Sequence, residues 1–168
     1  MRKYILSIAA IACCIGAGFA AGVMFEKKKD KNAPRITGIG GVFFKCQNPK
    51  ELKAWYAKYF GLAVDQYGTN FLWYEGADST HRGATQWSPF GEKTTYFAPS
   101  TKEFMINYRV KGMEALIAKM GADGIKPLDT LSDMGYGKFI HFMDPQGNKI
   151  ELWEPVDEKY DVGVSVTY

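Results

Sequence analysis

Apolar and polar positions along the chain predict two stretches with the same order of elements. In the first, an apolar run at 39–46 is typical of a strand and leads to a helix start at Asn48-Pro49. An asparagine side chain can cap a helix, and proline suits its first turn. An apolar helical face then recurs at spacings i, i+3, i+4 and i+7, through Leu52, Trp55, Tyr56 and Tyr59. Gly61 can end this helix with a positive φ.

Short strands are predicted after this helix at 62–67, 70–75 and 83–88. The second stretch repeats the order, with a strand at 104–110 and a helix whose apolar face is Met113, Leu116, Ile117 and Met120. Further strands are predicted at 125–128, 138–143 and 148–153. The last two are joined by a turn at 144–148, where Asp144 can bond the backbone and Gly147 tolerates a left-handed conformation.

This order indicates an α+β domain at 36–155, made of two βαβββ modules related by a pseudo-twofold axis. Each module is expected to supply half of a cup. A charged linker at 26–35 precedes the domain, and an acidic tail at 156–168 follows it.

Residues 1–25 carry an uncharged, Ala- and Gly-rich run after Arg2 and Lys3, and they predict an N-terminal hydrophobic helix. At 1.5 Å per residue, the run reaches roughly 33 Å, enough to cross a bilayer core of about 30 Å. This segment has three interpretations: a transmembrane anchor, a cleaved signal peptide, or the attachment segment of a lipoprotein with Cys13 as its lipidated residue. Each places the protein in the bacterial cell envelope, anchored in the membrane or exported.

The basic charge lies mainly at the N-terminus. Six Lys and Arg against two Asp and Glu occupy the first 32 residues, which leaves 15 Lys and Arg against 16 Asp and Glu for the remainder. The domain is therefore close to neutral and has no basic stripe, so nucleic acid is not an expected partner. Apolar residues at 46% and aromatic residues at 15% predict a well-filled core.

Three segments carry a resemblance to a known family. They are the strand and helix start at 41–49, the Trp55-Tyr56 pair with Phe60-Gly61-Leu62, and the segment Met143-Asp-Pro-Gln-Gly-Asn-Lys-Ile-Glu-Leu-Trp153. Together they resemble the vicinal oxygen chelate superfamily, which includes glyoxalase I, extradiol dioxygenases and bleomycin-resistance proteins. The resemblance implies the paired βαβββ cup, a small organic ligand and a homodimer, and it identifies fold better than chemistry.

Metal-dependent members of this family hold their ion at four positions, which correspond here to Gly41, Gln86, Met105 and Glu151. Glycine has no side chain, and a thioether is a poor ligand for a hard divalent cation. The two oxygens that Gln86 and Glu151 could supply are too few for a catalytic ion. We therefore predict no cofactor, and a divalent metal at Gln86 and Glu151 is not expected.

Strand alternation predicts which side chains face the cup. Phe43, Gln86, Met105, Asn107, His141 and Trp153 are the candidate substrate-binding residues. Glu151 is the candidate catalytic base, since burial among aromatic side chains would raise its pKa. The alternative is a structural role, in which its carboxylate is hydrogen-bonded to Gln86 or bridged by water.

Two functions remain open at this stage. One is sequestration of a small organic molecule in a metal-poor, aromatic-lined cup, as in bleomycin-resistance proteins. The other is a glyoxalase-like lyase or isomerase step in which Glu151 accepts a proton, helped by Gln86 or His141. Replacing Glu151 with glutamine separates them, because only an enzyme should lose turnover while it keeps its ligand.

Overall fold

A computed structural model describes residues 33–75 and 78–156 of the chain. Its first half contains β1 (Arg35–Cys46), α2 (Pro49–Phe60), β2 (Thr69–Glu75) and β3 (Asp78–Gly91). Its second half contains β4 (Phe104–Lys111), α3 (Met113–Ala122), β5 (Ser132–Asp133), β6 (Gly137–Met143) and β7 (Lys149–Pro155). The predicted α+β class is confirmed.

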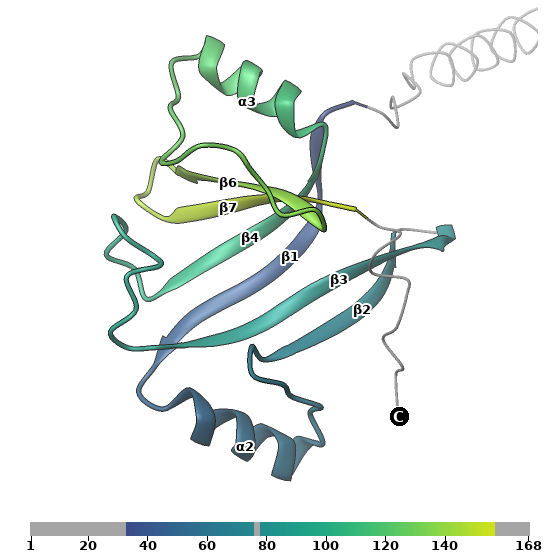
Figure 1. Ribbon diagram of the computed structural model, residues 1–168, viewed down its shortest axis with the longest axis vertical. Helices are drawn as coiled ribbons and strands as arrows, with labels where there is room; N and C mark the ends of the chain where they lie inside the picture. Colours follow the sequence, from purple (N-terminus) through teal and green to yellow (C-terminus); the bar gives the residue numbers. More distant parts are fainter. Residues whose placement is uncertain (1–32, 76–77, 157–168) are drawn as a thin grey trace, which may run out of the picture. The chain divides into compact units, whose positions relative to one another are not determined.

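All the described strands join one mixed sheet in the order β2-β3-β1-β4-β7-β6-β5. The two halves meet where β1 pairs antiparallel with β4, while β1 with β3 and β4 with β7 are parallel pairs. Helix α2 lies beside the β2–β3 end of the sheet, and α3 lies beside the β6–β7 end (Figure 1). The sheet therefore combines a half from each module, as the repeated element order predicts.

Local signals set both ends of α2. The Asn48 side chain accepts a hydrogen bond from the Glu51 N–H at 3.1 Å, and its own amide donates to the Glu51 carboxylate at 3.2 Å. Gly61 follows the helix at φ 66°, in the left-handed region that glycine adopts without a steric penalty. Both predictions for this helix are confirmed.

Two predicted strands are wrong. Residues 62–67 form a loop, because the Asp65 carboxylate accepts the Tyr67 and Gly68 N–H groups, and Lys53 donates to two backbone carbonyls of the loop. Residues 125–128 also form a loop, in which the Leu128 N–H donates to the His141 carbonyl at 2.8 Å. Neither segment therefore adds a strand to the sheet.

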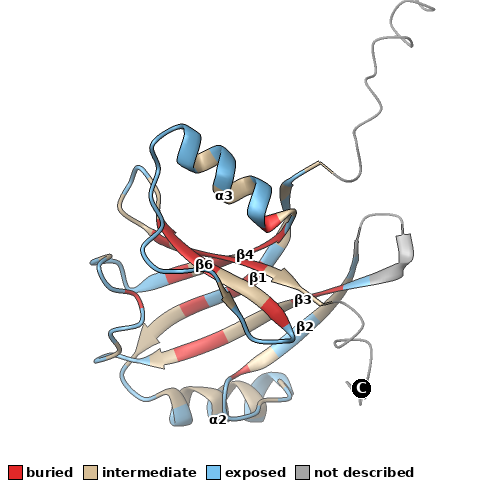
Figure 2. Cartoon of the chain, turned by 45° about the horizontal axis from the view of Figure 1, so that its top comes forward, coloured by how far each residue is buried: buried red, intermediate tan, exposed pale blue. Residues whose placement is uncertain are grey.

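The core has two parts. Between α3 and the sheet, a buried cluster comprises Met113 of α3 together with Val110, Ile140, Phe142 and Leu152 of β4, β6 and β7. A second cluster holds Phe43, Phe97 and Met105. Figure 2 shows the buried positions concentrated on the central strands.

Helix α2 buries none of its residues completely, although its predicted apolar face exists. Trp55 is 47% exposed and Tyr59 60% exposed. Tyr56 packs on the Trp87 ring of β3 at a centroid distance of 5.0 Å. This helix is therefore held to the sheet by one side of its aromatic face.

The predicted N-terminal segment 1–25 lies outside the described residues, as do most of the linker 26–35 and most of the tail 156–168. Neither helix within 33–75 and 78–156 has the length and apolar character that crossing a bilayer requires.

Candidate ligand-binding site

One row of residues crosses six strands of the sheet. Reading from β2 to β6, the paired positions are Asn70, Gln86, Gly41, Asn107, Glu151 and His141. Because strand pairing fixes neighbours about 5 Å apart, this register brings polar side chains from both halves into line. The row holds the most buried polar side chains of the sheet, with Asn107 and Glu151 each 3% exposed.

Glu151 is the centre of a hydrogen-bond network. Its Oε1 accepts from Asn107 Nδ2 at 2.5 Å, and its Oε2 accepts from the Tyr96 hydroxyl and from His141 Nε2, the latter at 2.8 Å. Asp129 holds the other side of the imidazole, with Oδ2 at 2.6 Å from His141 Nδ1 and Oδ1 accepting the His141 backbone N–H at 3.0 Å. Three side chains therefore orient the Glu151 carboxylate, and Asp129 orients one of them, His141.

These contacts decide the charge of Glu151. Burial alone would raise its pKa, but hydrogen bonds from His141, Tyr96 and Asn107 outweigh burial and hold the pKa below its usual value. Our prediction of a raised pKa is therefore wrong. Burial opposes the charged form of His141, yet the hydrogen bond to Glu151 and the contact with Asp129 raise the pKa of its imidazole. Both shifts favour an ionised Glu151 carboxylate paired with a protonated His141 imidazole.

Tyr96 and Lys149 complete the network. Burial, together with the Glu151 carboxylate, raises the pKa of the Tyr96 phenol, so the hydroxyl keeps its proton and acts as a donor. The Lys149 ammonium donates a hydrogen bond to the Tyr96 carbonyl at 2.7 Å and lies 5.1 Å from the Tyr96 ring centroid. These contacts fix the loop that carries Tyr96 against β7.

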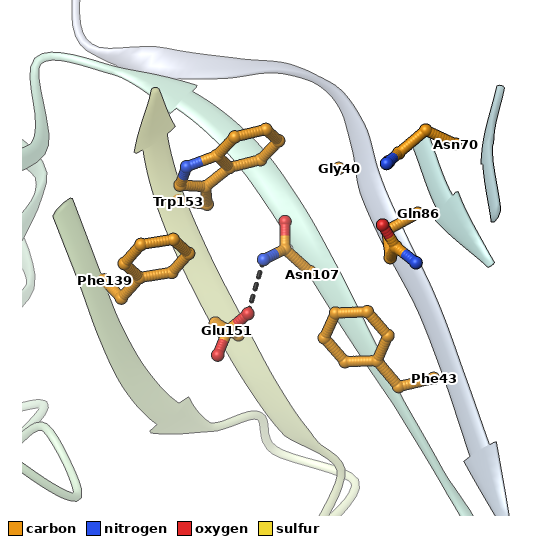
Figure 3. A pocket seen from close by; sticks show the side chains of 8 residues that line it. All are labelled: Gly40, Phe43, Asn70, Gln86, Asn107, Phe139, Glu151 and Trp153. Carbon is orange, nitrogen blue, oxygen red and sulfur yellow. Dashed lines mark hydrogen bonds between the residues drawn. The ribbon is translucent and has the colours of Figure 1, made fainter. Parts of the chain in front are cut away.

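A cavity of about 180 Å³ lies over this row. Figure 3 shows the side chains around it. The lining residues come from β1, β2, β3, β4, β6 and β7, and they are Gly40, Phe43, Asn70, Gln86, Asn107, Phe139, Glu151 and Trp153. Its walls are aromatic, and the polar groups are amides and one carboxylate. A small hollow of this composition is typical of a site for a small molecule.

Gly40 keeps the cavity open. The pairing of β1 with β4 shifts register between Ile39 and Gly41, which is a bulge. A Cβ at Gly40 would lie 2.1 Å from Asn107 Oδ1 and 2.8 Å from the Trp153 ring. A hydrogen atom is therefore the only side chain that this position accepts without movement of Asn107.

The candidate residues fall into three groups by their position. Phe43, Gln86, Asn107, Glu151 and Trp153 line the cavity, and His141 contacts Glu151 from behind it. Met105 does not reach the cavity, because it is completely buried against Phe43 and Phe97. Met105 pairs with Phe43, two residues along β4 from the row. Asn107 is the β4 residue that pairs with Gly41, at the position where we predicted Met105.

Sequence reasoning did not include three residues of the site. Asn70 lies on β2 opposite Gln86, and alternation on the predicted strand could have found it. Tyr96 and Asp129 lie in loops, outside any strand or helix. No periodic pattern marks loop residues, so only the folded chain brings these two to Glu151.

The family model for the Glyoxalase/Bleomycin resistance protein/Dioxygenase superfamily matches residues 38–152. The chain belongs to this superfamily. No curated protein matches the sequence of this superfamily member.

Solved structures of methylmalonyl-CoA epimerases share the superfamily fold. The enzyme from Mycobacterium tuberculosis aligns with TM-score 0.50 and 14% identity over 75% of this chain and 93% of its own. An epimerase in complex with methylmalonyl-CoA and NH4+ aligns with TM-score 0.52 and 15% identity, over 73% and 96%. A Streptomyces coelicolor epimerase variant with 2-nitronate-propionyl-CoA gives the same score and identity, over 73% and 99%. At this identity the likeness concerns the fold.

The metal site found in some members of the superfamily does not fit the residues of this cup. Gly41 has no side chain and Met105 lies in the core with Asn107 in its place, which leaves two neutral amides, Gln86 and Asn107, and the Glu151 carboxylate. Glu151 already accepts three hydrogen bonds, and both ring nitrogens of His141 face carboxylates. Within the described residues no group of three or more His, Cys, Asp and Glu side chains is arranged to hold a metal ion. The donor set therefore lacks what a divalent cation requires.

Proposed function

We propose that this cup binds and sequesters a small organic molecule, and that it does so without a divalent metal ion. The supporting observation is the cavity of about 180 Å³ that lies against the hydrogen-bonded Glu151. Cavities for drug-sized ligands enclose roughly 300–1,000 Å³, so the occupant of this one is smaller. Aromatic walls supply contact area, and the amides of Gln86 and Asn107 orient the guest.

A thermal-unfolding screen of small aromatic compounds tests this function. A ligand present at about 100 times its Kd stabilises the folded state by about 2.7 kcal/mol, which is a measurable rise in Tm. The variant Gln86→Phe should fill the cavity and abolish the rise. Gln66→Phe is the matched control, since Gln66 is exposed in the loop before β2. If Gln86→Phe leaves the rise unchanged, the compound binds elsewhere and this site is not the receptor.

Acid–base catalysis is the second candidate. The observation in its favour is the chain Asp129–His141–Glu151, which connects a carboxylate that is 45% exposed with one that lines the cavity. Such a chain can carry a proton between solvent and a bound molecule. The lowered pKa of Glu151 weakens it as a base, which is why we place binding first.

Proton exchange separates the two candidates. An isomerase or lyase of this kind should move deuterium from D2O into the carbon next to the carbonyl of small hydroxycarbonyl compounds, as measured by NMR. Glu151→Gln should abolish this exchange. A protein that only sequesters its ligand should give no exchange above that of the buffer.

We also propose that residues 1–25 deliver the domain to the cell envelope, as a transmembrane anchor or as an exported protein with a cleaved signal. Fractionation of the full-length chain tests this, and recovery entirely in the cytosol would contradict it. The expected homodimer stays a prediction, for which light scattering of the purified domain is the measurement.

A further inference from the structure

The side-chain amide of Asn107 contains a buried, unpaired acceptor that lies next to Gly40 in the wall of the cavity. Its Nδ2 donates to Glu151, which fixes the amide orientation and turns Oδ1 to the opposite side, toward Gly40 and Trp153 (Figure 3). Asn107 is 3% exposed, and Oδ1 has no hydrogen-bond partner within the described part of the chain. A buried carbonyl oxygen without a donor is costly, so a donor on the ligand would stabilise the site.

Glu151 adds a second acceptor beside it. Oε2 takes two donors, while Oε1 takes only Asn107 Nδ2 and retains room for another hydrogen bond. Because the pKa of Glu151 is held low, this oxygen carries negative charge at neutral pH. The row thus contains two acceptors for a ligand, the charged Glu151 Oε1 and the neutral Asn107 Oδ1, which lie at the two ends of the Asn107 amide.

Positive groups near the cup are already engaged. His141 directs both ring nitrogens to carboxylates, and Lys149 bonds the Tyr96 carbonyl. The Arg109 guanidinium lies 5.9 Å from the Trp153 ring centroid and has further partners. None of these three belongs to the lining among the described residues. A ligand in the cavity therefore meets one carboxylate, neutral amides and aromatic rings but no positively charged side chain of the described lining. The carboxylate and the ring faces attract a cation.

We infer that the ligand is a small organic cation, an aromatic or aliphatic compound with a protonated amine. This inference rests on the proposed function, since it names the chemistry of the molecule that the cup binds. The ammonium donates to Asn107 Oδ1 and Glu151 Oε1, and the apolar part of the compound contacts Phe43 and Phe139. An anionic compound would lie against the Glu151 carboxylate, and none of the described lining residues carries a positive charge that could pair with the anion.

Calorimetric titration with three compounds of similar size tests the inference: benzylamine, benzyl alcohol and benzoate. At pH 7, benzylamine should bind at least about tenfold more tightly than benzyl alcohol, a difference of about 1.4 kcal/mol, and benzoate should bind least. Glu151→Gln should reduce the preference for benzylamine over benzyl alcohol to within about twofold. The matched control is Glu92→Gln, which removes an exposed carboxylate after β3 and should change neither affinity.

A second variant keeps the test valid if Glu151→Gln does not fold. Gln86→Glu adds a carboxylate to the cavity wall and should increase the preference for benzylamine, whereas Gln66→Glu should not. Equal or tighter binding of benzyl alcohol or benzoate overturns the inference but leaves the cup as a receptor. If none of the three compounds binds at millimolar concentration, the proposed function fails as well.

Discussion

Replacing His141 with leucine should lower the free energy of unfolding, because the buried Glu151 charge then lacks its partner. Glu151 is 3% exposed, and His141 is its charged partner at 2.8 Å. Removing one partner of a buried ion pair costs about 3–5 kcal/mol, because the remaining charge is left uncompensated. Tyr96 and Asn107 still donate to Glu151, so we expect a loss near the lower end, about 3 kcal/mol.

Urea denaturation followed by tryptophan fluorescence measures this loss. In His141→Leu, burial should raise the pKa of Glu151 above its unfolded value, so the folded state binds the proton more tightly. The free energy of unfolding of this variant should then rise as the pH falls from 7 to 5. Adding Glu151→Gln removes the charge, so the double variant should be more stable than His141→Leu at pH 7 and should lack the pH dependence.

Asp129, on the other side of the His141 imidazole, provides a control for the loss of stability expected in His141→Leu. Asp129 is 45% exposed, so solvent screens its charge, and Asp129→Asn should cost at most about 1 kcal/mol. A His141→Leu variant that is as stable as the double variant, or whose stability is the same at pH 5 and pH 7, would show that His141 does not compensate a buried charge.

Three further results are expected. The wild-type domain should lose stability as the pH rises through the raised pKa of His141, since the charged imidazole contributes fully only below its unfolded value near 6.5. Urea denaturation should show this loss between about pH 7 and 9, and His141→Leu, whose pH dependence comes from Glu151 and lies between about pH 5 and 7, should lack it there. Asn48→Ala should cost about 1 kcal/mol in the same assay because α2 loses its N-cap, whereas Gln47→Ala, at the exposed neighbour, should be neutral. Protein purified without chelator should contain well under one equivalent of Ni, Zn, Fe or Mn by mass spectrometry; a stoichiometric ion would mean that the cup holds ligands other than those assigned.

Signals that act within a few residues were readable from the sequence. The Asn48 cap, the Gly61 helix end and the turn at 144–148 all follow from local chemistry, and the Asp144 carboxylate accepts from Gln146 and Asn148 as its position predicts. Strand alternation also placed Glu151 and Asn107 on the same side of the sheet. These features need no knowledge of distant contacts.

Features that depend on pairing between distant segments were not readable. Alternation gives Met105 and Asn107 the same face, but only the register of β4 with β7 shows that Asn107 lies opposite Glu151. The charge state of Glu151 likewise depends on Tyr96, which is 55 residues away and in a loop. Burial alone suggested the wrong direction for its pKa, because the donors that stabilise the carboxylate come from other elements.

The bulge at Gly40 makes one position in β1 diagnostic for homologous sequences. An alanine there would displace the Asn107 amide, so the hollow and the orientation of the amide would be lost by the same substitution. Homologues that keep glycine at this point, together with asparagine and glutamate on the neighbouring strands, should retain a receptor. Homologues with alanine at this position should have the fold without the cavity. An alignment of their sequences is enough to tell the two groups apart.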